Sequence, residues 1–497
     1  YARVSYREAN RVCNRIAHAL IASGLQRGDR VALLCENSVE AYLLKLGIAK
    51  AGMVALPINT MMAPDMVEHL LRHCDVKVAA VDTALWGTGR LPFERVGVRF
   101  ILRIGAAATG LDAPNFSAFF EHASDEEPET QIHGDDIWQI LPTSGTTSTP
   151  KAVMISHTTS YMGAMSQALS YTRGLALEGE LRMCSFLPVV FHVGDQGFVL
   201  APLMCGGSVV IGRKFDPAGI ARAVTEEKAT ALWGGSPALI ADIVREVEAH
   251  PEHYDFSRLT VLIYGWGAMP PELTARLQRL APRVLLVGIF GQTEAIAFHR
   301  FWPARWPELY QRTAPQLNYV GVPSPMLGAT VMDEQGQSLH EQPGVPGEVV
   351  YRSPTVSAGY FRDEAATRDS LKHGWFHSGD MCAFDEDGLK IMLDRYKDMI
   401  KSGGENVSSL RVEAVLAQHP SVRRAAVVGV PDARWGERVT GVVVLMPNQQ
   451  LDEPALIAFC RERLAGFETP KRIVAIEDLP VTVGGKVLKY KLRQMLA

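Results

Sequence analysis

The chain has 497 residues, 47% of them hydrophobic and 21% charged, and a formal net charge of −4. That length predicts two or more domains, and the apolar fraction is sufficient for buried cores. The chain lacks a basic run, an apolar stretch long enough to span a bilayer, and a CxxC pair among its seven cysteines, so we expect no nucleic-acid partner, transmembrane segment, disulfide framework or zinc site.

The chain begins at Tyr1, without an initiator methionine or a signal-like segment, so we expect residues of the natural protein to precede it. The scattered cysteines favour a reducing, cytoplasmic setting. Helical periodicity then alternates with short β-rich runs: a helix is predicted over 8–23, a strand over 30–35 and a helix over 39–51. This alternation is typical of parallel strands joined by crossover helices.

Further short buried strands are predicted where apolar runs end in Gly, Pro or a polar turn. They cover residues 76–81, 209–211, 231–233, 259–264 and 284–287. Between residues 321 and 362, closely spaced Gly and Pro with β-branched residues and no helical period predict an antiparallel, barrel-like unit.

The pattern becomes mixed again after Asp394, where about a hundred residues contain their own helices and strands. Helices are predicted over 410–419 and 453–465, and strands over 425–430 and 439–445. The predicted fold is therefore α/β, with a large N-terminal domain of parallel α/β sheets plus a small β-barrel, and a smaller, mobile α+β C-terminal domain. We place these domains at 1–393 and 399–497, with a hinge at 394–398.

The loop LPTSGTTSTPK, residues 141–151, follows an apolar segment and is suited to binding phosphates. It contains hydroxyls, a flexible glycine and a cation, at Ser144, Gly145, Thr146, Thr147, Ser148 and Lys151. It is not a Walker A loop, because Lys151 follows a proline and is not itself followed by Ser or Thr. Taken alone, the loop is also compatible with a solvated Ser/Thr turn.

Four further segments follow in order: FGQTE at 290–294, WFHSGD at 375–380, DRYKDMIKSGGENV at 394–407 and GGK at 484–486. Together with the loop, they resemble in order and spacing the adenylate-forming superfamily of acyl-CoA synthetases, luciferases and peptide-synthetase adenylation domains. The resemblance covers nearly the whole chain. It implies ATP, Mg²⁺ and CoA as cofactors and a small carboxylic acid as substrate.

Activating a carboxylate with ATP brings two anions together, so cations and oriented donors must offset their repulsion. The resemblance implies that Lys486 bridges the carboxylate and the α-phosphate, that Thr293 contacts the α-phosphate and that Glu294 is the magnesium ligand. A carboxylate suits that hard cation. Taken singly, Glu294 and Lys486 are compatible with ordinary solvated surface charges. With His192, these residues form the predicted catalytic set.

The resemblance also implies the nucleotide and CoA contacts. Phe290 would stack on adenine, Asp380 would accept both ribose hydroxyls, and Arg395 would contact the ribose or a phosphate. The predicted binding set is Thr143, Ser144, Gly145, Thr146, Thr147, Lys151, Gly267, Ala268, Phe290, Gly291, Gln292, Asp380, Arg395, Lys401, Gly403 and Gly404. The glycine pair in this set would approach the pantetheine arm of CoA, and Lys397 would be the hinge about which the C-terminal domain turns.

The segment 186–207 resembles one wall of the acyl pocket of CoA ligases, with His192 at their histidine position. Domains that activate amino acids have an aspartate after the phenylalanine here, so Phe191-His192 argues against an amino-acid substrate. The predicted acid-binding set is His192, Trp233, Gly234, Gly235, Trp266, Gly267 and Ile289. Its apolar lining suits a hydrophobic acid, although each apolar residue alone is compatible with ordinary core.

The sequence departs from the superfamily pattern at Ser148, Ala152 and Trp266, where glycine is common. A side chain at 148 restricts the backbone, so we expect altered loop mobility and slower nucleotide turnover. An indole at 266 would reshape the pocket, and we expect the pair Gly234-Gly235 to open room on the opposite wall for a broad alicyclic or polycyclic acid.

These observations predict an ATP-dependent acyl-CoA ligase that forms acyl-AMP and pyrophosphate and then transfers the acyl group to CoA. Three alternatives stay open: an acyl-AMP ligase that loads a carrier protein, a luciferase-like oxygenase, and a degenerate nucleotide-binding or interaction protein. The acid could be fatty, alicyclic or polycyclic. The oligomeric state is also open, with a homodimer as one alternative.

Overall fold

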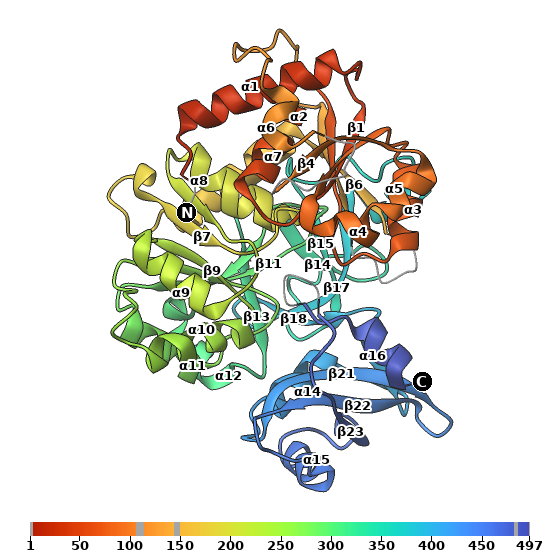
Figure 1. Cartoon of the computed structure of the whole chain (residues 1–497). Coiled ribbons are helices and arrows are strands. Elements are labelled where there is room, and N and C mark those ends of the chain that lie inside the picture. The colour runs from red at the N-terminus through yellow and green to blue at the C-terminus, as the bar shows by residue number, and fades with distance from the viewer. Residues whose placement is uncertain (1–2, 106–113, 144–149, 482–485, 497) are drawn as a thin grey trace. The chain divides into compact units, whose positions relative to one another are not determined.

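The structure is a computed structural model that describes residues 3–105, 114–143, 150–481 and 486–496 (Figure 1). The chain divides into two compact units, each assembled from separate stretches of sequence. The first unit comprises Tyr1–Ala223, Gly291–Ala297 and Ser353–Asp369, and the second comprises Val224–Phe290, Phe298–Arg352 and Ser370–Ala497. The FGQTE motif is therefore divided after its phenylalanine.

A six-stranded sheet organises the first unit, in the order β4-β3-β1-β2-β5-β6. Its neighbours are parallel except for β5 and β6, which form an antiparallel pair. The strands are β1 (Arg30–Leu34), β2 (Val54–Pro57), β3 (Val78–Asp82), β4 (Arg99–Ile104), β5 (Ile137–Pro142) and β6 (Ala152–Ser156). The predicted alternation of strands and helices is confirmed.

Helices cover both faces of this sheet, because successive side chains of a strand point to opposite sides. Val31 and Leu33 pack in one buried cluster with α1 (Tyr6–Ala22) and α2 (Val39–Lys50). The intervening Ala32 and the following Leu34 pack in another cluster with α3 (Pro64–His73) and α5 (Leu91–Val96). The sheet is therefore a buried scaffold for the loops at the ends of its strands.

Serine caps explain where three of these helices begin. The Ser5 hydroxyl accepts the Glu8 backbone N–H while the Glu8 carboxylate accepts the Ser5 backbone N–H, which is a complete capping box at the start of α1. Ser38 caps α2, and Ser156 caps α7 (His157–Tyr171). The α7 cap fixes the start of the helix directly after β6.

The rest of the first unit includes an eight-residue π-helix that begins directly after His192, labelled η3 (Val193–Leu200). The strands β7 (Arg182–Ser185) and β8 (Ser208–Ile211) precede and follow this helix in sequence, and they pair in parallel. The remaining helices of this part of the chain are α4 (Trp86–Gly89), α6 (Phe116–Phe120), α8 (Ala201–Met204), α9 (Pro217–Glu226) and α13 (Glu364–Ser370).

The second unit contains a long mixed sheet, in the order β14-β15-β17-β18-β13-β12-β11-β10-β9, with the short β16 (Leu371–Lys372) paired to β17. The strands β9, β10 and β11 are parallel and the others antiparallel. Their bounds are β9 (Ala231–Gly235), β10 (Val261–Tyr264), β11 (Leu285–Phe290), β12 (His299–Phe301), β13 (Asn318–Pro323), β14 (Gly328–Met332), β15 (Gly347–Arg352), β17 (Trp375–Phe384) and β18 (Lys390–Arg395).

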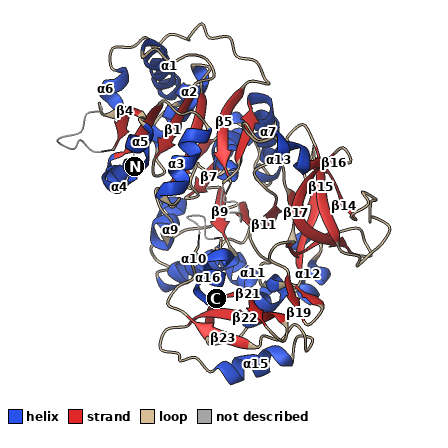
Figure 2. Ribbon diagram, turned by 90° about the vertical axis from the view of Figure 1, so that its right-hand side faces the viewer, coloured by secondary structure: helices blue, strands red, loops and turns tan. Residues whose placement is uncertain are grey.

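The antiparallel pairing predicted between residues 321 and 362 is confirmed for β13, β14 and β15, and the barrel-like shape stays a prediction. In the parallel part, the connecting helices are α10 (Pro237–Ala249) and α11 (Pro271–Leu280), and α12 (Pro307–Thr313) follows β12. Figure 2 shows the strands in red and the helices in blue. The strands β9 and β11 end at residues predicted to surround the adenine and the acid, and β10 ends shortly before Trp266.

The C-terminal part of the second unit has a sheet of its own, in the order β20-β19-β22-β21, with β23 paired to β22. One face packs on α14 and α15, and the other on α16. The elements are β19 (Ile400–Ser402), β20 (Glu405–Val407), α14 (Ser409–Leu416), β21 (Val422–Asp432), β22 (Gly436–Leu445), α15 (Glu453–Arg461), β23 (Arg472–Ala475) and α16 (Lys489–Leu496). The predicted α+β character is confirmed.

The fold class is confirmed, with a large N-terminal part of mixed α/β structure and a smaller C-terminal part. The domain bounds at 1–393 and 399–497 stay a prediction. Among the described helices, none combines the length and the apolar character that crossing a membrane requires. All seven cysteines are free thiols.

Candidate active site

The predicted phosphate loop joins the antiparallel strands β5 and β6 of the first unit. The Thr143 N–H donates to the Lys151 carbonyl at 2.9 Å and thereby closes the base of the loop. The other predicted binding residues here, Ser144, Gly145, Thr146 and Thr147, lie outside the described residues, as does the departure Ser148. The departure at Ala152 is buried at the start of β6.

Tyr360 links the lysine of this loop to the acidic residue of the FGQTE motif. The Lys151 ammonium lies 4.5 Å from the centre of the Tyr360 ring, a cation–π contact. The Tyr360 hydroxyl donates to Glu294 Oε1 at 3.0 Å, and the Ser357 N–H donates to the Glu294 carbonyl at 2.7 Å. Burial and the adjacent Glu294 charge raise the pKa of Tyr360, so the phenol keeps the proton that it donates.

Tyr360 is a site residue that the sequence analysis missed. Its backbone runs along β6: the Met154 N–H donates to the Gly359 carbonyl and the Phe361 N–H to the Ala152 carbonyl. The sequence S-A-G-Y-F does not show whether its tyrosine is a site residue or an ordinary core residue. Its role depends on pairing with a strand some two hundred residues away. The segment 353–369 therefore belongs with the phosphate loop.

His192 and Thr293 meet in the first unit, although they are distant in sequence. His192 Nδ1 and Thr293 Oγ1 are 3.1 Å apart and share a hydrogen bond. Burial lowers the pKa of His192 to about 3, so the imidazole is neutral at physiological pH. A neutral ring can orient a hydroxyl or an acid by hydrogen bonding, but it adds no positive charge to the site.

The backbone that follows FGQTE is fixed by α7. The Gln167 side-chain amide donates to the Ile296 carbonyl at 3.0 Å. Ile296 is fully buried and has a φ of 55°, which is unusual for a β-branched residue. Among the described residues, no acceptor lies within hydrogen-bond reach of Gln292 Nε2, although that atom is buried. This motif is thus held by its surroundings while it presents polar groups.

The aromatic residues predicted to surround the acid and the adenine lie in the second unit. Trp233 and Trp266 meet edge to face, with ring centres 5.2 Å apart. Trp266 is 41% exposed and has a φ of 62°, a left-handed conformation that glycine adopts without strain. Gly267 and Ala268 follow it, and Ile289 and Phe290 end β11.

The expectation that Gly234 and Gly235 open room in the pocket is wrong. A Cβ on Gly234 would lie 2.6 Å from Ile240 Cγ1, and a Cβ on Gly235 would lie 2.7 Å from Leu239 Cδ1. The first turn of α10 already fills the space that these glycines leave. They allow close packing of β9 against α10 and do not enlarge an acid-binding site.

Asp380 and Arg395 form a pair between neighbouring strands β17 and β18. The Arg395 Nε donates to Asp380 Oδ1 at 2.9 Å, and the aspartate is buried. Burial raises the pKa of the Asp380 carboxyl, and the positive charges of Arg395, Lys486 and Lys397 act in the opposite direction. A buried carboxylate beside a guanidinium suits the recognition of vicinal hydroxyls, because it accepts hydrogen bonds at both oxygens.

The remaining predicted residues of the second unit are exposed. Lys401, Lys486 and the hinge residue Lys397 have exposed side chains. Burial of the ammonium and the neighbouring charge of Arg395 nevertheless lower the pKa of Lys397 to about 7. Gly403 and Gly404 connect β19 to β20 with φ values of 63° and 88°, so the turn requires left-handed backbone at both positions. The backbone of this glycine turn is exposed.

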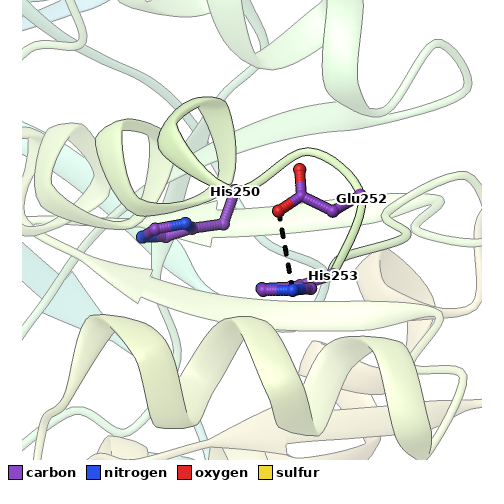
Figure 3. Close-up of side chains that lie close together, drawn as sticks. All are labelled: His250, Glu252 and His253. Atoms are coloured by element: carbon purple, nitrogen blue, oxygen red, sulfur yellow. Dashed lines mark ion pairs between the residues drawn. The ribbon is translucent and has the colours of Figure 1, made fainter.

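One cluster of three potential metal ligands occurs among the described residues, at the C-terminal end of α10. It consists of His250, Glu252 and His253, all exposed (Figure 3). The two imidazoles are nearly parallel, with ring centres 5.8 Å apart. Imidazoles do not suit Mg²⁺, which prefers oxygen ligands. The cluster is therefore not the predicted magnesium site, for which the carboxylate of Glu294 is the chemically suitable group.

The comparisons with known proteins agree with these features. The model of the AMP-binding enzyme family matches residues 1–361, and that of the AMP-binding enzyme C-terminal domain matches residues 411–486. The chain is 33% identical to a feruloyl-CoA synthase of an Amycolatopsis species, over 99% of this chain and 94% of that protein. It is 31% identical to a long-chain-fatty-acid–CoA ligase of Mycobacterium tuberculosis, over 99% and 93% of the two chains.

Among solved structures, an anthranilate CoA ligase in complex with anthranoyl-AMP matches with a TM-score of 0.86 and 25% identity, over 98% of this chain and 91% of that one. The family models cover most of the chain, and the sequence relatives cover nearly all of it. The chain therefore belongs to the AMP-binding enzyme family, and it is an AMP-forming acid–CoA ligase of the adenylate-forming superfamily.

Proposed function

We propose that the protein activates a hydrophobic carboxylic acid as acyl-AMP and then transfers the acyl group to CoA. In the first step a carboxylate oxygen attacks the α-phosphorus of ATP, and the bond to pyrophosphate breaks. In the second step the CoA thiolate attacks the acyl carbon, the thioester forms and AMP leaves. The observation that carries this proposal is the linkage of Lys151, Tyr360 and Glu294 in the first unit.

That linkage supports a triphosphate site, because it joins a cation and a carboxylate through one tyrosine. We propose that Lys151 and the loop that it ends bind the β- and γ-phosphates. Glu294 would hold magnesium, which would neutralise phosphate charge when bound. Tyr360 would orient Glu294, since its hydroxyl donates to one carboxylate oxygen. Thr293 would contact the α-phosphate and receive its orientation from His192.

In the second unit, we propose that Phe290 stacks on adenine and that Asp380 accepts the ribose hydroxyls, with Arg395 fixing the carboxylate. Lys486 would bridge the substrate carboxylate and the α-phosphate during adenylation. The exposed pair Gly403-Gly404 would then face the pantetheine arm after the C-terminal domain turns about Lys397. Such a hinge lets one active site serve two reactions.

The acid itself is proposed to be hydrophobic, because Trp233, Trp266 and Ile289 offer apolar surface and His192 is neutral. Fatty, alicyclic and polycyclic acids remain the proposed classes. Since Gly234 and Gly235 add no space, bulk would have to be accommodated beside Trp266. We keep a cytoplasmic setting as part of the proposal.

The test is acid-dependent pyrophosphate release, measured across a panel of fatty, aryl, alicyclic and polycyclic acids, followed by detection of the thioester with CoA. We expect release with a restricted set of acids and a thioester from the same set. Transfer to a holo-carrier protein but not to free CoA would favour the carrier-loading alternative. ATP binding without release for any acid would contradict the proposal and favour a degenerate nucleotide-binding protein.

A further inference from the structure

A buried ion pair joins α2 to the π-helix that follows His192. The side chains of Lys45 and Asp195 are 1% and 0% exposed, and the Lys45 ammonium contacts Asp195 Oδ2. The Tyr42 hydroxyl donates to the other oxygen, Oδ1, at 2.9 Å, and Gln196 Nε2 donates to Oδ2 at 3.0 Å. The carboxylate is thus fully occupied by partners from two elements.

The ammonium is also fixed by more than its counter-ion. Lys45 Nζ donates to the Val189 carbonyl at 3.4 Å and lies 5.1 Å from the centre of the Trp138 ring. Asn37, which precedes the Ser38 cap of α2, binds residues 187–189. Its side-chain amide donates to the Leu187 carbonyl at 2.9 Å, and its side-chain oxygen accepts the Val189 N–H at 2.9 Å. The stretch that leads into His192 is therefore attached to α2 and to the residue before its cap.

A buried ion pair of this kind is not an efficient way to stabilise the folded protein. Removing two charges from water is costly, and well-packed apolar residues of similar volume are usually at least as stabilising as a buried ion pair. What the pair does supply is direction, because a charged carboxylate bound at both oxygens allows one placement of its backbone. The geometry thus favours a role in positioning.

The backbone so placed is the one that carries His192. The Asp195 N–H donates to the Phe191 carbonyl at 3.0 Å, so the aspartate lies on the first turn after the histidine. An eight-residue π-helix is unusual, and such turns concentrate at functional sites. On its other side the π-helix packs on α7, where a Cβ on Gly197 would lie 2.3 Å from Gln167 Oε1. The same Gln167 side chain donates to the Ile296 carbonyl.

We propose that Lys45, Asp195 and Tyr42 are positioning residues that hold the His192 wall of the acid site in register with Thr293. This inference rests on the proposed function, because it assigns the wall to binding of the carboxylic acid. The ion pair attaches the π-helix to α2, and Gln167 of α7 packs against Gly197 of the π-helix. Together these contacts keep the histidine within hydrogen-bond distance of the threonine.

The diagnostic variant is the double substitution K45M/D195L, which removes both charges and keeps side chains of similar length and branching. We expect it to stay folded with a modestly lower Tm, since no uncompensated charge remains but the Tyr42 hydroxyl and the Gln196 amide lose their acceptor. The KM for the preferred acid should rise about tenfold, because a small misplacement of a binding group has effects of this order. The KM for ATP should stay within about twofold. Tyr42→Phe should give a smaller increase in the acid KM.

The single variant K45M leaves a buried carboxylate without its cation and is expected to be less stable, so it serves only as a measure of the pair's burial. The matched control is Leu20→Ala, a core truncation on α1 that should lower the Tm without changing the acid KM. Unchanged acid KM in a folded K45M/D195L protein would overturn the proposal.

Hydrogen exchange gives a readout that is independent of catalysis. In K45M/D195L the amides of residues 189–200 should exchange at least tenfold faster, while those of β1 and β2 keep their protection. Wild-type protection of that segment in the double variant would overturn the positioning role. If the wild type releases pyrophosphate with none of the acids tested, the proposed function fails. The exchange experiment then still decides whether the ion pair holds the π-helix in place.

Discussion

The polar residues around His192 and those after Asp394 have contrasting surroundings. In the first unit, His192 and the ion pair of Lys45 with Asp195 are buried and held by partners on several elements. In the C-terminal part of the second unit, Lys401, Gly403, Gly404 and Lys486 are exposed. A fixed wall suits the recognition of one acid, whereas exposed residues suit partners that change between two half-reactions.

The largest loss of activity should come from a substitution among the exposed residues of the C-terminal part. Lys486→Ala removes the cation proposed to bridge two anions, so acyl-AMP formation should fall about 1000-fold. The Tm should not change, because the side chain is exposed. Acid-dependent pyrophosphate release and thermal unfolding are the measurements. Lys491→Ala, at another exposed lysine on α16, is the control. An equal loss in both variants would show that net charge, and not the position of Lys486, matters.

The next largest losses of activity should come from substitutions at Glu294 and Tyr360 in the first unit. Glu294→Gln removes the proposed magnesium ligand and should lower the rate about 100-fold, with a higher magnesium requirement. Tyr360→Phe should lower it about tenfold, since one hydrogen bond to a charged group is lost. Magnesium titrations of pyrophosphate release measure both. Tyr254→Phe removes the same type of hydrogen bond, to Glu246 on α10, and should have no effect. Full activity in the Tyr360 variant would contradict its role.

A glycine variant separates the two half-reactions. Gly404→Ala places a side chain at a φ of 88° in the turn proposed to face CoA, so thioester formation should fall about 30-fold while pyrophosphate release is kept. Gly344→Ala imposes similar strain at a φ of 77°, also with open space around the Cβ, outside that turn. Thioester formation and pyrophosphate release are assayed separately. Equal losses of thioester formation in both variants would contradict the CoA assignment.

Trp266 tests the shape of the acid site. Trp266→Gly relieves a left-handed backbone and removes the edge contact with Trp233, so relative kcat/KM should shift about tenfold toward bulkier ring acids. Met326→Gly relieves a similar backbone, with a φ of 69°, and should leave the preference unchanged. Kinetics with pairs of small and large acids decide the matter. An unchanged ranking in the tryptophan variant would place Trp266 outside the acid site.

The smallest effect concerns the pH dependence of stability. Burial holds the pKa of His192 at about 3 in the folded protein, whereas an unfolded histidine has a pKa near ~6.5. Between these values the unfolded chain binds a proton that the folded chain does not. The stabilising contribution is therefore complete above about pH 6.5 and falls by at most roughly 1.4 kcal/mol for each pH unit below it.

The measurement is denaturant unfolding of the wild type and His192→Asn between pH 4.5 and 7.5. The difference in unfolding free energy should favour the wild type less as the pH falls. His299, whose pKa burial also lowers, is present in both proteins and cancels. Parallel pH curves would contradict a neutral, buried His192.

Local patterns predicted much of this molecule. The helix predicted over 8–23 is α1 at Tyr6–Ala22, because its apolar period is strong and Ser5 caps it. The five motifs were identifiable because each is a short local run. Trp266 was identified as a departure from glycine, and its φ of 62° gives the physical reason why glycine is common there.

Contacts between distant segments could not be predicted in this way. Lys45 and Asp195 are 150 residues apart, and no period or spacing marks them as partners. Tyr360 likewise depends on the pairing of its segment with β6. The expectation for Gly234 and Gly235 is wrong because a sequence does not reveal whether a neighbouring helix fills the space of a missing Cβ.

The most direct test of the central claim follows an oxygen atom. The acid is labelled with ¹⁸O in its carboxylate and incubated with the enzyme, ATP, Mg²⁺ and CoA, and the products are examined by mass spectrometry. Attack of the carboxylate on the α-phosphorus predicts one ¹⁸O in the phosphate of AMP for each thioester formed. Thioester formation with the label in inorganic phosphate and none in AMP would contradict an acyl-adenylate and the account built on it.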